Sequence, residues 1–286
     1  MKLILGSANF GTSYGISNTL KKISSNETKK ILTIAKKNKI SLIDTAANYK
    51  NSEKIIGNHK ISYEFDIITK LPKIGKNIHL IEKFIFQSLK RLKKKQLYAV
   101  LIHSIDDLNS KNINKIFLEL NKLKIKKIIK KIGVSVYSEK NLEFIIKNYN
   151  IDIVQFPASI FDLRFLKKNF LLNLKKKKIK IFIRSIFLQG VIFLSTLVIK
   201  KKFKNYSKKI IKFKHDLNQD TDKMINYCLS FIKQFKHIDG IIVGINSSNH
   251  LLQILNNSKK IKIISLKKYS IMNEKMLIPY NWKKIK

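Results

Sequence analysis

Four side chains that could take part in proton transfer follow three short apolar runs of this chain. Asp44, Lys70 and His103 each stand at the end of such a run, and Tyr49 follows Asp44 by five residues. The runs cover residues 41–44, 65–70 and 99–103. An acid, a lysine, a histidine and a tyrosine that lie close together can orient a substrate, tune a pKa and deliver a proton.

Each of the four also has an ordinary structural explanation when it is considered alone. A histidine after an apolar strand is more often a satisfied core residue, and an aspartate can cap the following helix. A lysine can extend to solvent, and a tyrosine can pack with its hydroxyl satisfied. Their common position favours a proton-transfer site, because independent structural roles would not place all four at the ends of successive strands.

Eight short apolar runs recur along the chain, and longer segments with helical periodicity lie between them. Runs that are apolar throughout, instead of alternating, are typical of strands buried on both faces of a parallel sheet. The predicted strands are residues 3–5, 41–44, 65–69, 99–102, 131–134, 153–156, 180–183 and 240–243. Eight such units without a Pro/Gly/Ser-rich linker predict one α/β domain over residues 1–286, a (β/α)8 TIM barrel. An open doubly wound sheet is the structural alternative.

One connection between predicted strands is longer than the others. About 60 residues separate the starts of the last two strands, and the surplus lies at about residues 188–222. In a parallel barrel the carboxyl ends of all strands share one rim, where active sites form. A long insertion at that rim is more often a lid or a binding loop than an accident.

The chain is strongly basic, with 59 lysines and arginines against 18 acids and a formal net charge of +41. Such a charge is typical of proteins that bind nucleic acids or anionic membranes. Here lysines lie on every predicted helix face instead of one stripe, and the arginines that favour base readout are scarce. We therefore attribute the charge to genome composition and expect no specific nucleic-acid partner. The charge should still attract anionic small molecules.

Cys228 is the only cysteine, so no disulfide can form within the chain, and we expect a reducing compartment, the cytoplasm. No cluster of cysteine and histidine has the spacing of a zinc site, and no metal is predicted. The N-terminal apolar run is too short for a signal peptide. The longest apolar stretch, residues 181–199, contains Arg184, Gln189 and Gly190. These residues would be costly in a lipid-facing helix, so no membrane span is predicted.

Several motifs resemble those of the aldo/keto reductases. Residues 44–57 resemble the family signature D-T-A-x-x-Y-G-x-S-E-x-x-x-G, with Lys50 in place of the first glycine. Shorter segments resemble, in order, the lysine, histidine, G-V-S-N, glutamine and phosphate-site strands of the family; they are residues 68–72, 101–104, 133–135, 154–157 and 242–244. The resemblance covers the whole chain. Residues 184–190 resemble a bacterial branch of the family that is often encoded with surface-polysaccharide genes.

The resemblance implies NAD(P)H-dependent reduction of a small-molecule aldehyde, ketone or sugar carbonyl. Tyr49 would then donate the proton, and His103 would bind the substrate oxygen. A free tyrosine has a pKa of about 10, so it is a poor acid at neutral pH. Lys70 would lower that pKa by stabilising the phenolate, and Asp44 would hold Lys70 in place.

The resemblance also implies a set of cofactor-binding residues. Ser135 and Gln155 would hydrogen-bond the nicotinamide carboxamide, and Arg184 would stack on a flat ring. The set is Gly11, Thr12, Asp44, Ser135, Gln155, Arg184, Ser185, Phe187, Gln189, Gly190, Gly244 and Ser247. NADPH is the expected cofactor, but NADH stays open because residues 245–250, after Gly244, contain no lysine or arginine.

Two other functions, from different classes, compete with the reductase interpretation. A regulatory protein could bind the cofactor with little turnover, although such a protein has no need of a proton donor. A nucleic-acid-binding protein could use the net charge, but the chain has no recognised motif and no face that interleaves aromatic and basic residues. The sequence leaves the substrate and the oligomeric state open.

Overall fold

The computed structural model describes residues 1–11, 23–259, 265 and 268–284. Eight parallel strands pair in chain order, and the first also pairs with the last, so the sheet closes into a barrel. The strands are β1 (Lys2–Gly6), β2 (Leu42–Asp44), β3 (Asp66–Lys70), β4 (Leu97–Ile102), β5 (Ile129–Ser135), β6 (Ile153–Pro157), β7 (Lys180–Arg184) and β8 (Gly240–Gly244). All eight predicted strands are confirmed within two residues at either end, and the open doubly wound sheet is excluded.

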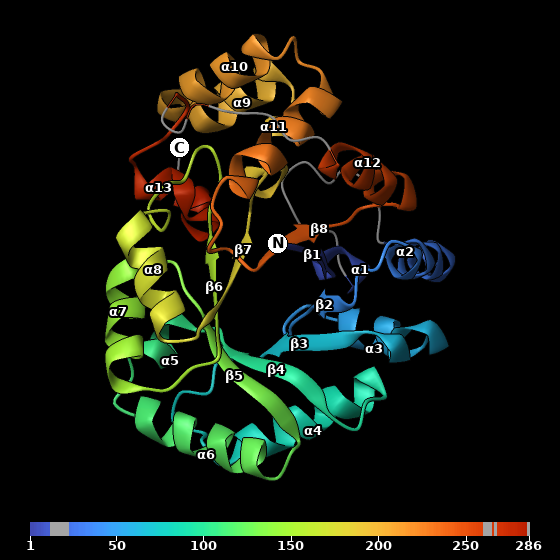
Figure 1. Ribbon diagram of the computed structural model, residues 1–286, viewed down its shortest axis with the longest axis vertical. Helices are drawn as coiled ribbons and strands as arrows, with labels where there is room; N and C mark the ends of the chain where they lie inside the picture. Colours follow the sequence, from blue (N-terminus) through green and yellow to red (C-terminus); the bar gives the residue numbers. More distant parts are fainter. Residues whose placement is uncertain (12–22, 260–264, 266–267, 285–286) are drawn as a thin grey trace.

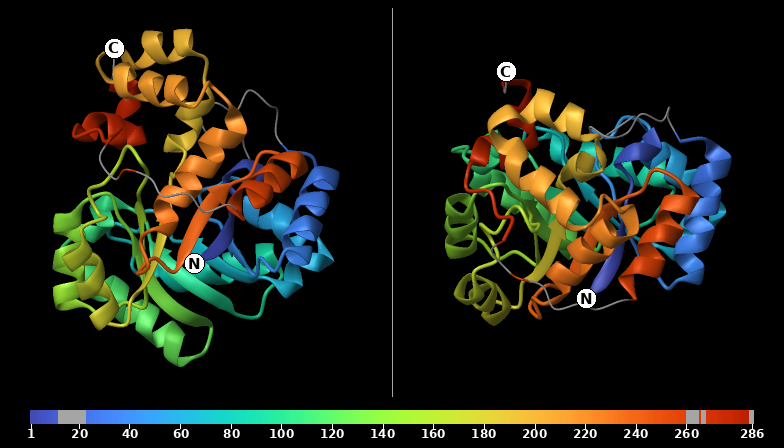
Figure 2. Two further views of the ribbon diagram at one scale, coloured as in Figure 1. Left: turned by 45° about the horizontal axis from the view of Figure 1, so that its top comes forward. Right: turned by 90° about the horizontal axis from the view of Figure 1, so that it is seen from above.

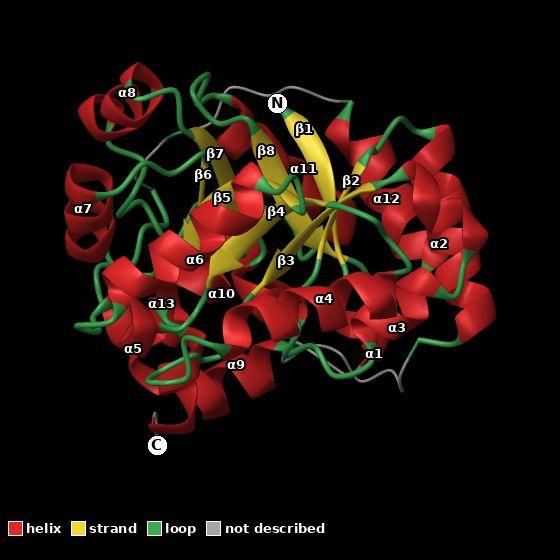
Figure 3. Cartoon of the chain, turned by 90° about the horizontal axis from the view of Figure 1, so that it is seen from below, coloured by secondary structure: helices red, strands yellow, loops and turns green. Residues whose placement is uncertain are grey.

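Helices surround the barrel on its outer side (Figures 1 and 3). The α-helices are α1 (Ala8–Gly11), α2 (Ser25–Lys37), α3 (Ser52–Gly57), α4 (Leu80–Leu92), α5 (Ile105–Leu108), α6 (Ile113–Ile125), α7 (Glu139–Asn148), α8 (Lys168–Lys176), α9 (Thr196–Phe203), α10 (Ser207–Asp216), α11 (Thr221–Lys233), α12 (Ser248–Ser258) and α13 (Glu274–Leu277). The 3-10 helices are η1 (Lys60–Glu64), η2 (Leu188–Phe193), η3 (Lys204–Tyr206) and η4 (Pro279–Lys284). Within the described ranges, none of these helices has the length and apolar character needed to cross a membrane.

Apolar side chains cover both faces of the sheet. One buried cluster comes from strands all round the barrel and fills its interior; it contains Ile4, Leu42, Ile68, Ala99, Leu101, Ile153, Phe182 and Ile242. A second, larger cluster lies between the outer face of the strands and the helices. Because both faces are buried, the strands appear in the sequence as continuous apolar runs.

The register of the strands brings the predicted site residues to one rim. Gly6 of β1 pairs with Asp44 of β2 and with Gly244 of β8. Ser135 of β5 pairs with Gln155 of β6. These residues lie at or near the carboxyl ends of their strands, so their side chains can face a common site.

The connection from β7 to β8 carries additional helices. Residues 188–222 contain η2, α9, η3, α10 and the first residues of α11. Helices α9 and α10 lie beside the C-terminal segment (Figures 1 and 2). The rings of Phe203 and Trp282 meet with their centroids 5.2 Å apart, and the Tyr269 hydroxyl donates to Asp216 at 2.7 Å. The C-terminal segment thus anchors this connection through packing and hydrogen bonding.

Four helices end in the same left-handed turn, and each turn is built on a lysine. Lys39, Lys93, Lys127 and Lys178 follow α2, α4, α6 and α8 with φ values of 59°, 53°, 58° and 57°. In each case the next amide donates back to the helix: Ile40 to Ala35, Lys94 to Leu89, Ile128 to Leu123 and Ile179 to Leu174. This is the Schellman arrangement, in which glycine is usual because a Cβ is unfavourable at positive φ.

Replacing these lysines by glycine should stabilise the fold. Lys127→Gly and Lys178→Gly should each raise the free energy of unfolding by about 0.5–1 kcal/mol, because relief of left-handed strain exceeds the added entropy of the unfolded chain. Urea denaturation measures this as a higher midpoint with an unchanged slope. Lys83→Gly, at an exposed position inside α4, is the control and should cost about 1 kcal/mol. Destabilisation at Lys127 and Lys178 as well would contradict the strain argument.

Candidate active site

Lys70 is the buried cation of the site, and its ammonium is held by two oxygens. Lys70 is 1% exposed. Its Nζ donates to Asp44 Oδ2 at 2.6 Å and to the Thr45 carbonyl at 2.8 Å. The same Nζ lies 5.2 Å from the centroid of the Tyr49 ring. The structure therefore brings three of the four predicted catalytic residues into direct proximity.

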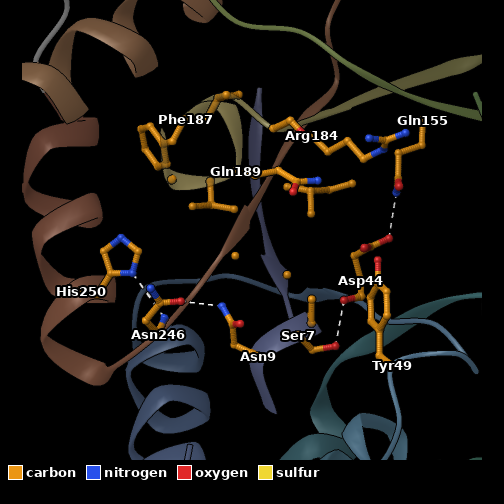
Figure 4. A pocket seen from close by; sticks show the side chains of 18 of the residues that line it. Ser7, Asn9, Asp44, Tyr49, Gln155, Arg184, Phe187, Gln189, Asn246 and His250 are labelled. Atoms are coloured by element: carbon orange, nitrogen blue, oxygen red, sulfur yellow. Dashed lines mark hydrogen bonds between the residues drawn. The ribbon is translucent and has the colours of Figure 1, made fainter. Parts of the chain in front are cut away.

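The second oxygen of Asp44 is held from the opposite side of the barrel. Gln155 Nε2 donates to Asp44 Oδ1 at 2.8 Å, and Ser135 Oγ donates to Gln155 Oε1 at 3.4 Å. Figure 4 shows the Gln155 and Asp44 side chains pointing toward each other. Both carboxylate oxygens of Asp44 thus accept a hydrogen bond, and Asp44 orients Lys70 and Gln155 together.

A cavity of about 330 Å³ opens at this rim. Its lining contains ten of the predicted site residues: Asp44, Tyr49, His103, Gln155, Arg184, Ser185, Phe187, Gln189, Gly190 and Gly244. Lys70 and Ser135 lie behind the wall, where they support Asp44 and Gln155. Ser247 lines a neighbouring cleft instead. Thr12 falls outside the residues that the structure describes.

Burial sets the charges at this rim. It lowers the pKa of His103 to about 3, helped by the cations Lys70 and Arg184, so the imidazole is neutral at physiological pH. Burial also lowers the pKa of Lys70, against the opposing effect of Asp44. The pKa of Tyr49 is raised, first by burial and then by the Asp44 carboxylate. We expected Lys70 to lower the pKa of Tyr49, but desolvation of the phenolate and the Asp44 carboxylate raise it against the opposing charge of Arg184, and Tyr49 keeps its proton at neutral pH.

The model of the aldo/keto reductase family matches residues 2–274. The chain belongs to the aldo/keto reductase family. No curated protein matches the chain significantly. Solved structures of other proteins show the same fold at low sequence identity. A putative aldo-keto reductase from Pseudomonas aeruginosa is 17% identical, with a TM-score of 0.67, over 90% of this chain and 88% of that one.

Two further solved structures match with higher TM-scores than this one. The aldo-keto reductase AKR11C1 from Bacillus halodurans, in its holo form, is 14% identical with a TM-score of 0.73, over 99% of this chain and 91% of its own. The glycerol dehydrogenase AKR11B4 from Gluconobacter oxydans is 18% identical with a TM-score of 0.70, over 93% and 88%. Identities this low show the fold alone. The family membership places this chain among the carbonyl-reducing oxidoreductases.

The signature segment of this reductase builds the turn that carries Tyr49. Ser52 Oγ lies 2.9 Å from Ser7 Oγ and donates at 2.9 Å to the Ser7 carbonyl. A Cβ on Gly11 would lie only 2.5 Å from the Tyr49 carbonyl and 2.4 Å from the Ser52 amide. Gly11, predicted to approach the cofactor, thus packs directly under the turn of Tyr49. Lys50 adopts a φ of 46° at the glycine position of the signature, so this chain accepts some strain there.

The glutamate of the signature secures the turn from behind. Glu53 is 1% exposed. It accepts hydrogen bonds from Thr69 Oγ1 at 2.6 Å and from Arg91 Nε at 2.7 Å. These contacts tie α3 to β3, the strand that ends in Lys70, and to α4. The conspicuous acid of the motif is therefore a structural residue.

The loop after β7 forms the opposite wall of the cavity in an unusual backbone conformation. Ser185, Leu188 and Gln189 have φ values of 63°, 48° and 52°, and Gly190 has 88°. Strained backbone of this kind persists where the surroundings enforce it, commonly at binding sites. One support is the buried Lys214 of α10, whose Nζ donates to the Ile192 carbonyl at 2.9 Å.

Arg184 stands at the start of this loop and faces the cavity. Its guanidinium carbon lies 4.1 Å from the centroid of the Tyr137 ring, and its Nη2 donates to the Val136 carbonyl at 3.3 Å. Among the described residues it forms no salt bridge with an acid. Its charge instead lowers the pKa of His103 and opposes the rise in the pKa of Tyr49.

Sequence reasoning missed several residues of the cavity wall. Ser7, Asn9, Tyr137, Asn246 and His250 all line it. Asn9 Nδ2 donates to Asn246 Oδ1 at 2.5 Å, and the backbone amide of Asn246 donates to His250 Nδ1 at 3.3 Å (Figure 4). The sequence could have predicted Ser7, Asn9 and Asn246 as site residues, because they follow the carboxyl ends of β1 and β8, which lie at the rim where barrel sites form.

The depressed pKa of His103 predicts a stability that depends on pH. The folded pKa of about 3 lies below the unfolded value of about 6.5. The neutral imidazole therefore contributes fully above pH 6.5, and its contribution is lost as the pH falls from about 6.5 toward 3. When the pH falls from 7 to 5, the unfolding free energy of the parent should decrease because its unfolded state takes up a proton on His103. In His103→Gln this decrease should be smaller by about 1–2 kcal/mol.

Denaturation by urea at pH 7 and pH 5 measures this difference. His79→Gln is a suitable control, because His79 is exposed and its side chain caps nothing at the start of α4. This control should keep the pH dependence of the parent protein. An identical pH dependence in His103→Gln would show that His103 is not held neutral by the fold.

Proposed function

We propose that this chain reduces the carbonyl group of a small aldehyde, ketone or sugar at the expense of a nicotinamide cofactor. One observation carries the proposal. Asp44, Lys70 and Tyr49 form a contiguous set linked by a 2.6 Å ion pair and a 5.2 Å ammonium–ring contact, and Tyr49 and His103 line the same cavity. Proton transfer in a largely apolar cavity is what such a set can perform.

The surroundings of the cavity fit a nicotinamide cofactor. Gln155 presents an amide that is already oriented by Asp44 and Ser135, a suitable partner for a carboxamide. A cavity of about 330 Å³ suits a ring and a small substrate, and a cleft of about 1090 Å³ continues from it. The two share Phe193, Asn246 and His250, so together they offer an elongated site for a dinucleotide. The bound cofactor would supply a hydride to the carbonyl carbon.

The protein residues would then handle the charge that develops on the carbonyl oxygen. Neutral His103 can donate a hydrogen bond to that oxygen. Tyr49, protonated because its pKa is raised, would transfer its proton only to a base as strong as the developing alkoxide. Lys70 lies where its charge can stabilise the phenolate that remains, and Asp44 keeps the ammonium in position.

A turnover screen tests the proposal. Purified protein with NADH or NADPH should consume the reduced cofactor, detected as loss of its absorbance, with members of a panel of aldehydes, ketones and keto-sugars. Cofactor binding should appear separately as a change in intrinsic fluorescence. Binding without turnover across the whole panel would favour a regulatory protein, whereas no binding up to millimolar cofactor would reject both functions.

A further inference from the structure

The cleft beside the active-site cavity offers room for the other half of a dinucleotide. It has a volume of about 1090 Å³ and is lined by the β8–α12 turn, the first turns of α11, one side of α12 along its length and residues of the segment 193–198. If the proposed function holds and the nicotinamide end occupies the 330 Å³ cavity, the adenosine end must leave it through the shared residues Asn246 and His250. The charge of this cleft then determines which adenosine is accepted.

The cleft lacks the charge that dominates the rest of the protein. About one residue in five is lysine or arginine in this chain. Among its described lining residues there is no lysine or arginine, and the charged side chain is the carboxylate of Asp222. Asp222 accepts a hydrogen bond from Asn257 Nδ2 at 2.7 Å. The burial of His250 lowers its pKa, so this imidazole adds no positive charge at neutral pH.

A second acid occupies the N-terminus of α12, next to the cleft. Helix N-termini attract phosphates through their free amides. Here the Ser248 amide donates to Glu27 Oε1 at 2.5 Å, and the His250 amide donates to Ser247 Oγ at 3.1 Å. The bond from Ser248 lowers the pKa of Glu27, which is therefore ionised. Glu27 comes from α2, which packs beside α12 (Figures 1 and 2).

We propose that this cleft selects NADH over NADPH, with two specificity-determining residues: Asp222 in its lining, and Glu27 beside it at the opposite end of α12. The two cofactors differ by the 2′-phosphate on the adenosine ribose. A carboxylate near that ribose accepts hydrogen bonds from its hydroxyls and repels a phosphate, whereas enzymes that take the phosphate place an arginine there. This inference rests on the proposed function and replaces the expectation of NADPH that came from the family resemblance.

Direct binding tests the selection without any substrate. By isothermal titration calorimetry, NADH should bind at least tenfold more tightly than NADPH, a difference of about 1.4 kcal/mol. The net charge of +41 acts in the opposite direction, because it attracts the more anionic NADPH. Titrations at about 0.15 M and 0.5 M salt reduce that long-range attraction. Equal or tighter binding of NADPH at both salt concentrations would overturn the inference.

Two adenosine fragments assign the preference to the cleft itself. In competition with NADH, 5′-AMP should displace the cofactor at a concentration at least tenfold lower than adenosine 2′,5′-bisphosphate. The double variant Glu27→Gln, Asp222→Asn keeps an oxygen for Ser248 and for Asn257, so it should fold. It should reduce the preference for NADH at least fivefold.

The matched control removes two carboxylates from helices that do not line the cleft. Glu82→Gln with Glu119→Gln changes the net charge equally at exposed or half-buried sites of α4 and α6. This control should keep the preference of the parent; an equal loss would show that global charge sets the preference and would overturn the inference. Failure of the proposed function is distinct, since it would appear as binding of neither dinucleotide or as binding without turnover across the substrate panel.

Discussion

Tyr49→Phe should lower kcat for carbonyl reduction about a hundred- to ten-thousandfold, the range of a lost general acid. The affinity for the cofactor should stay within about twofold of the parent. The physical reason is that the ring remains, with its packing against the Lys70 ammonium 5.2 Å away, while the hydroxyl proton is removed. Steady-state kinetics with the best substrate of the panel measure kcat, and calorimetry measures the cofactor affinity.

The chain contains a closely matched control for this substitution. Tyr98 of β4 also lies beside a lysine, with Lys180 Nζ 5.7 Å from its ring centroid and donating to its hydroxyl at 3.0 Å. It lies at the opposite end of the barrel strands from the active-site cavity. Tyr98→Phe should therefore leave kcat within about threefold. A Tyr49→Phe variant that turns over as fast as Tyr98→Phe would remove Tyr49 from the mechanism.

Lys70→Met should abolish turnover and also destabilise the protein by about 3–5 kcal/mol. The substitution leaves the Asp44 carboxylate buried without its cation, and an uncompensated buried charge is costly. The loss of turnover has a separate cause, since no ammonium remains to stabilise the Tyr49 phenolate. Thermal or urea denaturation measures the stability, and single-turnover kinetics measure the chemical step.

A double variant separates these two roles of Lys70. In Asp44→Asn with Lys70→Met, the new amide can still accept from Gln155 Nε2, and no charge is left buried. Stability should recover most of the loss, because a neutral pair replaces the ion pair without an unpaired charge. Turnover should remain lost. Recovery of turnover along with stability would show that the ion pair serves the fold alone.

The barrel and the positions of its candidate catalytic residues follow from the sequence by a short physical argument. A strand buried on both faces must be apolar throughout, so the eight strands are visible as eight runs. Parallel strands in a closed barrel end at one rim, so a polar residue at the end of each run reaches the same site. That argument places Asp44, Lys70 and His103 correctly from their types and spacing alone.

Other features depend on how segments distant in the chain meet. The bond from Gln155 to Asp44 crosses the barrel between residues 111 positions apart. Arg184 reaches the ring of Tyr137, and Gly11 packs against the turn of Tyr49 instead of facing the cavity. Such contacts are set by side-chain packing, which the type and spacing of the residues do not specify.

The charges of the site were likewise predictable only in part from the sequence. Residue types predicted an ammonium close to Tyr49, and the structure has it 5.2 Å from the ring. The direction of the shift in the pKa of Tyr49 was decided by burial, which the sequence does not state. Likewise, the lack of a basic residue after Gly244 was readable in the sequence, whereas Glu27 at the N-terminus of α12 became visible only in the packed fold. The local sequence pattern determines which residues lie at the carboxyl-end rim of the barrel. Desolvation and contacts between distant segments determine what charge those residues carry there.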